Sequence, residues 1–465
     1  MSRKVPRPRG PVLFANAILG GAVAFSVLVL IYSIAKSSGW VTDPWEAGIN
    51  RFHIVAMLGM LFFGATLFLR ETWKINFALI TVSTGLAIYL AEIIVFVTLP
   101  AGGNMALLAR HAGIPYDGRT KYQVIKDMRA RGVDAVPAVS PNLFLATDGL
   151  NAGSQKLYPL GGIANKTTVL CNESGEHVIY QSDEHGFNNQ RGLHKKKNID
   201  VALIGDSYVH GMCVTPGEDV AGRLRSEGLR AISLGMRGSG PLIELAILSE
   251  YALPLKPRVV LWFYFENDLR DLAEEQSSAL LGRYMDRDFS QRLRDRQDEI
   301  DRVLVRQVRQ WETAITDRGG EATEEAGVFT GWKAVEKMFK LYHLRARLGI
   351  DRPSPYHGAP SPLFREILLS AHARIREAGG RMYFVFLPEW YQYAKTGRQE
   401  FVGRDEVLSV IRGLSIPMVD FDQVLGSHSD PLSLFPFRRA AHYTSDGYRL
   451  LEEQIVMRLK KDGVF

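Results

Sequence analysis

Apolar residues gather in three long runs within the first hundred positions of the chain. Pro11 to Ala35 carries no charge, Phe52 to Leu69 is shorter, and Ile75 to Leu99 is interrupted only by Glu92. A helix crosses a bilayer with about 20 apolar residues, whereas a cleavable signal peptide has one shorter apolar run. The pattern therefore predicts three transmembrane helices, at residues 11–35, 52–69 and 75–99.

From residue 199 onwards, short apolar strands alternate with amphipathic helices. Strands are expected at 200–204, 230–234, 259–265, 382–387 and 417–421, and helices at 216–226, 241–251, 361–378, 405–413 and 445–460. This alternation is typical of a mainly parallel sheet covered on both faces, which places the chain in the α/β class. The charged, helical interval 271–351, with its clearest helix at 292–313, reads as an insertion. It is either a lid or partner surface, or a solvated helical hairpin.

The stretch between these two parts is rich in glycine, proline and polar residues. A helix is expected at 120–131, and the proline-containing segments favour extended or turning chain. We interpret this stretch as a collar between the membrane and the globular domain. The predicted organisation is a membrane anchor at 1–100, a collar at 101–196 and an α/β domain at 197–465.

Charge sets the expected orientation and partners. Arg3, Lys4, Arg7 and Arg9 precede the first span, so the amino terminus is expected in the cytoplasm and everything after Leu99 outside. In a bacterium this is a multi-pass inner-membrane protein with a periplasmic domain. The net charge is only +6 and the basic residues are scattered, so the bilayer is an expected partner and nucleic acid is not.

The chain has two cysteines, Cys171 and Cys213. In an oxidising compartment a single pair invites a disulfide, and in a reducing one they are two unrelated thiols. No Cys-x-x-Cys pattern or His/Cys cluster indicates a metal site, and no cofactor is expected. Glu92 is costly in an apolar span unless it is paired. It either makes a proton or partner contact, or is hydrogen-bonded to a neighbouring helix or kept protonated.

The candidate chemistry begins where the first strand of the α/β domain ends, at Gly205-Asp206-Ser207. Thr215-Pro216-Gly217-Glu218 follows with the spacing of a helix-capping box. A turn between strand and helix lies at the carboxyl end of a sheet, where α/β proteins hold reactive groups. Ser207 is therefore a candidate nucleophile.

Three later features add to Ser207. The glycine loop containing Gly238 follows the second strand, Asn267 follows the third, and His442 precedes the last helix. A glycine loop offers unobstructed backbone N–H groups, and Asn offers an amide donor. A nucleophile, a base and two oxyanion donors are the parts needed for acyl transfer.

These four segments resemble the SGNH/GDSL hydrolase family across the region from Lys197 to Phe465 apart from the insertion. The resemblance implies a flavodoxin-like three-layer α/β/α domain with Ser207 as nucleophile and His442 as general base and then acid. It also implies an oxyanion hole of the Gly238 N–H and the Asn267 side chain, with the Ser207 N–H as a third donor. Phe265 replaces a glycine that the family often has.

A second departure concerns the acid of the site. The family usually has Asp three residues before the histidine, and this chain has Arg439 there. A guanidinium cannot stabilise an imidazolium, so a backbone carbonyl or another acid must serve, or the site is weakened. Asp420 and Asp422, at the end of the fifth strand, are the nearest candidates in sequence.

The expected function is that of a membrane-anchored, extracytoplasmic serine esterase or O-acyltransferase. The expected substrate is an ester, and by analogy with membrane-tethered SGNH domains an O-acyl group on a cell-envelope or secreted glycan. Two alternatives stay open at this point. One is a lipid or small-ester hydrolase at the membrane surface, and the other is a non-catalytic subunit that joins a membrane protein partner.

Overall fold

The structure is a computed structural model that describes residues 9–37, 51–98, 103–153, 155–195, 199–317, 338–347, 359–394, 403–439 and 442–465. The basic tail residues Arg3, Lys4 and Arg7 lie outside these ranges. The chain divides into two compact units. The first comprises Met1–Thr98 with Gly331–Gly358, and the second comprises Leu99–Thr330 with Ala359–Phe465.

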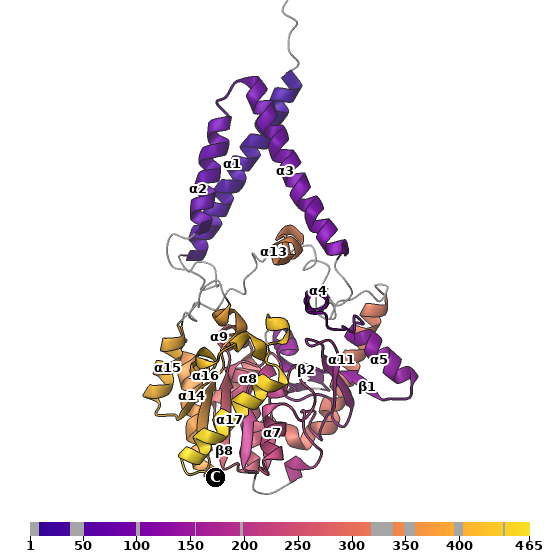
Figure 1. Cartoon of the computed structure of the whole chain (residues 1–465), viewed down its shortest axis with the longest axis vertical. Helices are drawn as coiled ribbons and strands as arrows, with labels where there is room; N and C mark the ends of the chain where they lie inside the picture. The colour runs from indigo at the N-terminus through magenta and orange to yellow at the C-terminus, as the bar shows by residue number, and fades with distance from the viewer. Residues whose placement is uncertain are drawn as a thin grey trace, which may run out of the picture. The chain divides into compact units, whose positions relative to one another are not determined.

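The first unit contains three apolar helices, α1 (Arg9–Ser37), α2 (Arg51–Thr66) and α3 (Glu71–Thr98). The helices α1 and α2 run side by side (Figure 1). The helix α1 contacts α3 through a small cluster built around three buried residues, Ala15, Leu19 and Ala78. All three predicted apolar segments are therefore helical.

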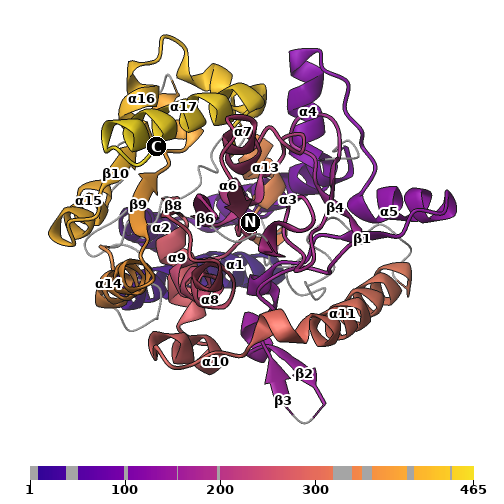
Figure 2. The ribbon, with the colours of Figure 1, turned by 90° about the horizontal axis from the view of Figure 1, so that it is seen from below.

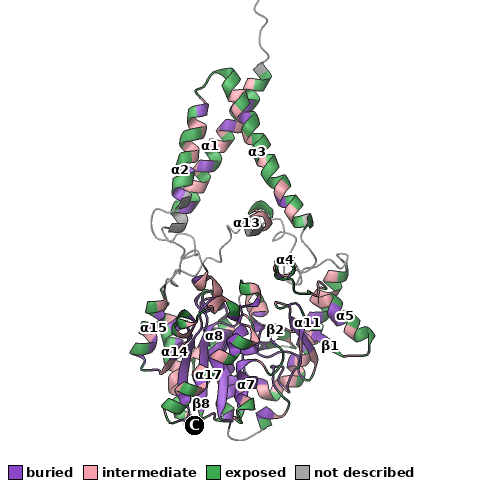
Figure 3. Ribbon diagram, viewed as in Figure 1, coloured by how far each residue is buried: buried purple, intermediate pink, exposed green. Residues whose placement is uncertain are grey.

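Two of the three helices are long and apolar enough to cross a membrane. The most apolar 18-residue windows of the segments Gly10–Ile34 and Glu71–Phe96 have mean hydropathies of 2.3 and 2.0, and only 17% and 6% of those windows are buried. Their side chains are thus largely uncovered (Figure 3). The helix α2 ends at Thr66 in a turn, and its 16 residues span about 24 Å, less than a bilayer core of about 30 Å. By length and composition, the prediction of three spans holds for two helices.

The second unit is built on a five-stranded parallel sheet, as the sequence predicted. The strands lie in the order β10-β9-β8-β6-β7, and each neighbouring pair is parallel. Every residue of β6, β7 and β8 is buried, which explains their continuous apolar sequences. Their bounds are β6 Val201–Ile204, β7 Ala231–Ser233, β8 Val259–Tyr264, β9 Arg381–Phe386 and β10 Met418–Asp420.

Helices cover both faces of this sheet (Figure 2). The helices α7 and α17 share one core with Leu203 and Leu261, and α8 and α14 lie on the opposite face. The helices of this part are α6 Ser207–His210, α7 Val220–Ser226, α8 Pro241–Ile247, α9 Asp268–Glu275, α10 Ala279–Gly282, α11 Gln297–Asp317, α14 Pro362–Glu377, α15 Arg404–Gly413, α16 Phe421–Ser427 and α17 Ser445–Lys461.

Two helix predictions need correction. The helix α7 starts at Val220 rather than at Pro216, because the Asp219 side chain accepts the Gly222 N–H and caps the helix. The capping box expected at Thr215 is therefore not the start of this helix. The helix α8 ends at Ile247 and continues as a π-helical turn over Leu248–Ala252.

The segment between the apolar helices and the sheet belongs to the second unit. It contains a three-stranded sheet in the order β1-β4-β5. Leu170 and Tyr180 of this sheet pack against Met212, which follows α6. Its elements are α4 Gly103–Ala112, α5 Lys121–Ala130, β1 Ala135–Pro137, β2 Leu150–Ala152, β3 Gln155–Leu157, β4 Thr167–Cys171 and β5 Val178–Gln181.

The predicted insertion is divided between the two units. The helix α11 covers most of the expected helix at 292–313 and lies in the second unit. Residues 318–337 and 348–351 lie outside the described ranges. The short helix α13 (Tyr342–Arg347) belongs to the first unit, together with α1–α3.

Candidate active site

Ser207 is the first residue of α6, directly after the turn that ends β6. A Cβ atom on Gly205 would lie 2.6 Å from Val209 Cγ2 and 2.9 Å from Phe263 Cβ, so only glycine lets the chain pass here. The Asp206 side chain caps α6 by accepting the Tyr208 N–H at 3.1 Å. The sequence Gly-Asp-Ser therefore produces a tight turn with the serine at the helix start.

His442 lies beside this serine. Its Nε2 is 2.8 Å from Ser207 Oγ, within hydrogen-bond reach. Its neighbour Tyr443 donates a hydrogen bond to the Pro388 carbonyl at 2.8 Å. The Tyr208 ring packs 4.9 Å from the imidazole. The position of His442 is thus fixed by packing against the Tyr208 ring and by the hydrogen bond of its neighbour Tyr443 to the loop after β9.

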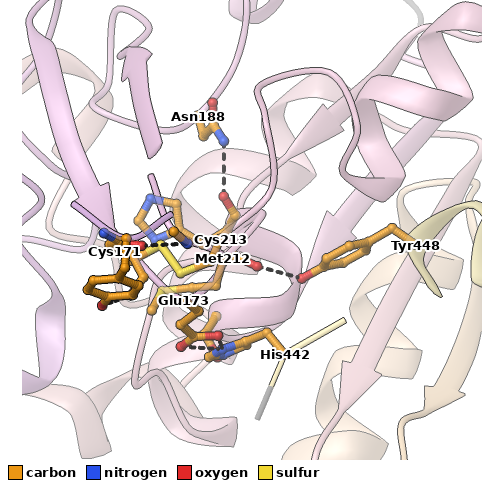
Figure 4. Close-up of a disulfide and its surroundings, with 12 residues drawn as sticks. Cys171, Glu173, Asn188, Met212, Cys213, His442 and Tyr448 are labelled. Carbon is orange, nitrogen blue, oxygen red and sulfur yellow. Dashed lines mark hydrogen bonds and ion pairs between the residues drawn. A yellow bond between two sulfur atoms is a disulfide. The ribbon is translucent and has the colours of Figure 1, made fainter. Parts of the chain in front are cut away.

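The carboxylate that pairs with His442 is that of Glu173, which the sequence reasoning missed. Both Glu173 carboxylate oxygens lie 2.9 Å from His442 Nδ1 (Figure 4). Glu173 stands just after β4, outside the region that resembles the SGNH family, so no motif pointed to it. The arrangement Ser207–His442–Glu173 is that of a nucleophile, a base and an acid that orients the base.

The contact between His442 and Glu173 favours the charged form of each side chain. Burial alone would lower the pKa of His442, but the charge of Glu173 and its hydrogen bond raise that pKa above the ordinary value. Burial likewise acts to raise the pKa of Glu173, and the contact with His442 outweighs it, so that the carboxyl pKa is lowered. Glu173 is therefore ionised when His442 accepts a proton.

The two cysteines join the acid's strand to the nucleophile's helix. Cys171 and Cys213 form a disulfide with a Cα–Cα distance of 5.7 Å (Figure 4). Cys171 ends β4, two residues before Glu173, and Cys213 follows α6. The Tyr180 hydroxyl adds a 3.0 Å hydrogen bond to His210 Nε2, at the end of α6. These links fix the small sheet against the turn that carries the nucleophile.

Asp420 and Asp422, the acids that the sequence suggested, have other partners, so this suggestion was wrong. Asp420 pairs with Arg404, and Asp422 lies 3.2 Å from the same guanidinium. Tyr393 also donates to Asp422 at 2.6 Å. Arg439, which occupies the family's usual acid position, is exposed.

Gly238 and Asn267 lie on neighbouring loops. Gly238 has a φ of +69°, and a Cβ there would lie 2.3 Å from Asn142 Nδ2, so the loop needs glycine on both counts. Within the described ranges its N–H has no hydrogen-bond partner. The Asn267 amide donates to Asp271 Oδ2 at 2.7 Å, which leaves its second N–H available. Their shared role as an oxyanion hole stays a prediction.

The carboxyl groups of Asp271 and Glu275 contact the loops that carry Gly238 and Asn267. Glu275 accepts the N–H groups of Gly240 at 2.6 Å and Leu242 at 2.9 Å. Burial raises the pKa of Glu275 to about 8 and that of Asp271 to about 7. In the described ranges, no group of three or more His, Cys, Asp and Glu side chains is placed to hold a metal ion.

No protein-family model and no curated protein matches the chain. Solved structures show a distant likeness. A lipolytic protein of the G-D-S-L family from Desulfitobacterium hafniense is 15% identical, covers 56% of this chain and all of its own, and has a TM-score of 0.31. A lipase/acylhydrolase from Enterococcus faecalis is 14% identical over 57% of this chain and 97% of its own, with a TM-score of 0.30.

A two-domain esterase active on acetylated mannans is similar at 11% identity, over 58% of this chain and 51% of its own, with a TM-score of 0.30. At these values the likenesses carry no argument about activity. The functional conclusion therefore rests on the geometry of the site.

Proposed function

We propose that this chain is a serine-dependent ester hydrolase or acyltransferase of the SGNH type. The observation that carries the proposal is the continuous chain of hydrogen-bond distances, 2.8 Å from Ser207 to His442 and 2.9 Å from His442 to Glu173. A serine hydroxyl becomes a useful nucleophile only when a positioned base takes its proton. Ser207 has that base, and the base has an ionised acid on its other nitrogen.

The proposed reaction proceeds in two steps. Ser207 Oγ attacks the ester carbonyl while His442 Nε2 takes its proton, and Glu173 stabilises the resulting imidazolium. The N–H groups of Gly238 and Asn267 donate hydrogen bonds to the carbonyl oxygen as negative charge develops on it, each bond worth about 3 kcal/mol in systems of this kind. His442 then protonates the leaving alcohol. Water or an acceptor hydroxyl resolves the acyl-serine, which distinguishes hydrolysis from transfer.

Fluorophosphonate labelling of the full chain tests this proposal. We expect the wild type to be labelled and Ser207→Ala to lose the label entirely. His442→Ala should lose most of it, because the hydroxyl is then no longer activated. Ser277→Ala, at an exposed serine in the turn after α9, is the matched control and should label like the wild type. A folded wild-type protein that takes no label refutes the proposal.

The proposed substrate is an O-acylated glycan, by analogy with membrane-tethered SGNH domains. The contacts of Glu266, the residue before Asn267, support it. Glu266 accepts a hydrogen bond from Tyr391, and Trp390 next to it is partly exposed. Aromatic side chains combined with a few placed polar groups are common in ligand sites. Trp390→Ala should raise KM for an acetylated oligosaccharide and leave aryl acetate turnover unchanged. An equal effect on both substrates contradicts a glycan subsite.

We further propose that the apolar helices of the first unit anchor the protein in the cytoplasmic membrane, with the α/β unit in an oxidising compartment outside it. If α1 and α3 are the two crossings, the chain returns to the side on which it starts, so the amino terminus lies on the same side as the α/β unit; the cytoplasmic amino terminus expected from the basic tail requires α2 as a third crossing. The Cys171–Cys213 pairing supports that compartment, because disulfides persist where thiols are oxidised. The case for a non-catalytic subunit depended on Arg439. Glu173, 2.9 Å from His442 Nδ1, offers the carboxylate that Arg439 cannot, which supports the catalytic alternative.

A further inference from the structure

Glu92 lies within the apolar helix α3, yet its side chain is completely buried. Its carboxylate is enclosed by a segment 251 positions later in the chain. Oε1 accepts the His343 N–H at 3.0 Å and lies 2.8 Å from His343 Nδ1. Oε2 accepts the Leu344 N–H at 2.6 Å. A carboxylate that would be costly in an apolar helix is thus satisfied by α13.

Aromatic contacts extend this pairing along α3. The rings of Phe96 and His343 lie 5.0 Å apart, and those of Tyr89 and Phe339 lie 6.4 Å apart. Tyr89, Glu92 and Phe96 occupy successive turns on one face of α3, because residues three and four apart share a face. The segment 338–347 therefore lies along one stripe of α3. It belongs to the same compact unit as α1–α3.

Large apolar and aromatic side chains of this segment are exposed. Met338 is 41% exposed, Phe339 70% and Tyr342 40%. Basic Lys340 and Arg345 are also exposed beside them. Aromatic and apolar side chains mixed with basic ones are characteristic of segments that lie in a membrane interface.

The position of Glu92 along α3 also fits a membrane interface. Glu92 precedes the end of α3 at Thr98 by six residues, a distance of about 9 Å along the helix. Interfacial helices are buried about 5–10 Å into the boundary between headgroups and acyl chains. The helix α13, with six residues, is too short to cross a bilayer.

We propose that the segment 338–347 is a membrane-interface element, seated on α3 through Glu92, with Met338, Phe339 and Tyr342 in contact with lipid. The partner is the leaflet of the bilayer in which the carboxyl-terminal end of α3 lies. This inference rests on the proposed membrane anchoring. It assigns part of the insertion to lipid contact rather than to a lid over the active site.

Lipid quenching in proteoliposomes tests the proposal on the full chain. Bimane is attached to Phe339→Cys, to Leu86→Cys in α3, and to Leu369→Cys, an exposed apolar position on α14. The native cysteines are paired and do not compete for the label. With nitroxide-labelled phospholipids, we expect quenching at positions 339 and 86 and none at 369. Quenching at 86 without quenching at 339 overturns this inference. Absence of quenching at both positions overturns the membrane anchoring as well.

A substitution at Glu92 tests whether its hydrogen bonds hold the segment 338–347 on α3. Glu92→Leu removes every acceptor for the His343 and Leu344 N–H groups but keeps α3 apolar, so quenching at position 339 should be lost while quenching at 86 is retained. Glu92→Gln keeps one carbonyl acceptor and should retain part of the quenching at 339. Unchanged quenching in Glu92→Leu shows that Glu92 does not hold the segment and overturns that part of the inference.

Discussion

The Glu173 carboxylate lies 2.9 Å from His442 Nδ1, although 269 positions separate the two residues. Glu173 lies in the loop between β4 and β5 of the small sheet that precedes the parallel sheet, and His442 precedes the last helix. The proposed catalytic arrangement is therefore complete only when both parts of the second unit are folded together.

The first prediction concerns the acid. Glu173→Gln removes the charge that stabilises the imidazolium, so kcat/KM for an aryl acetate should fall by roughly 10²–10⁴-fold. Glu176→Gln, an exposed position in the same loop, is the matched control and should be near wild type. If the two variants have equal activity, Glu173 does not serve as the acid.

The second prediction is a pH profile. His442 must be neutral to take the Ser207 proton, and its pKa is raised by Glu173. The acid limb of kcat/KM should therefore have its midpoint above the ordinary histidine value of about 6.5. In Glu173→Gln, burial is left to lower the pKa of His442, so the limb should move to lower pH even as the maximum falls. A limb that stays in place argues against the ion pair.

The third prediction concerns the disulfide. Cys213→Ser frees the strand that carries Glu173, and a misplaced acid should lower kcat by roughly 10–100-fold. In a Glu173→Gln background the same change should cause little further loss, because its effect passes through Glu173. Fully additive losses would mean that the disulfide supports activity by another route.

The fourth prediction is the pH dependence of stability. Burial raises the pKa values of Asp271 and Glu275 to about 7 and about 8, well above an unfolded value of about 4. The folded protein therefore favours the protonated form of both carboxyl groups. Their contribution to the free energy of unfolding is complete below about pH 4 and is lost as the pH rises through 7 and 8. The melting temperature of the second unit should therefore fall from pH 5.5 to 8.5.

Asp271→Asn tests the origin of that slope. The variant keeps an acceptor for Asn267 but cannot ionise, so its melting temperature should vary less over the same pH range. Glu274→Gln, an exposed position on the same helix, should retain the wild-type slope. Identical slopes in Asp271→Asn and the wild type would contradict a titration at Asp271.

Much of the fold could be read from the sequence. The five strands were predictable because apolar runs of strand length alternate with amphipathic helices, and this pattern depends on local residues alone. The positions of Ser207 and His442, next to strand and helix boundaries, were predictable for the same reason. The start of α7 was not, because Asp219 competes with Thr215 as a cap and both fit the local pattern.

Glu173 could not be found by local reasoning. It lies in a loop rich in polar residues, and its role depends on packing between two sheets that are distant in the sequence. The one available signal was the cysteine pair, since Cys171 is two residues from Glu173 and Cys213 is close to Ser207. The pairing of Glu92 with α13 is equally non-local, and the sequence left its interpretation open.

The cross-link between Cys171 and Cys213 joins two positions that are made early in the synthesis of the second unit's parallel sheet. These cysteines stand 42 positions apart and enclose both Glu173 and Ser207, whereas His442 is synthesised 235 positions after the serine. During synthesis, the disulfide can join the segments that carry Glu173 and Ser207 before His442 has been added to the chain. A polypeptide that ends before His442 can thus hold the closed loop and still lack the imidazole beside Ser207.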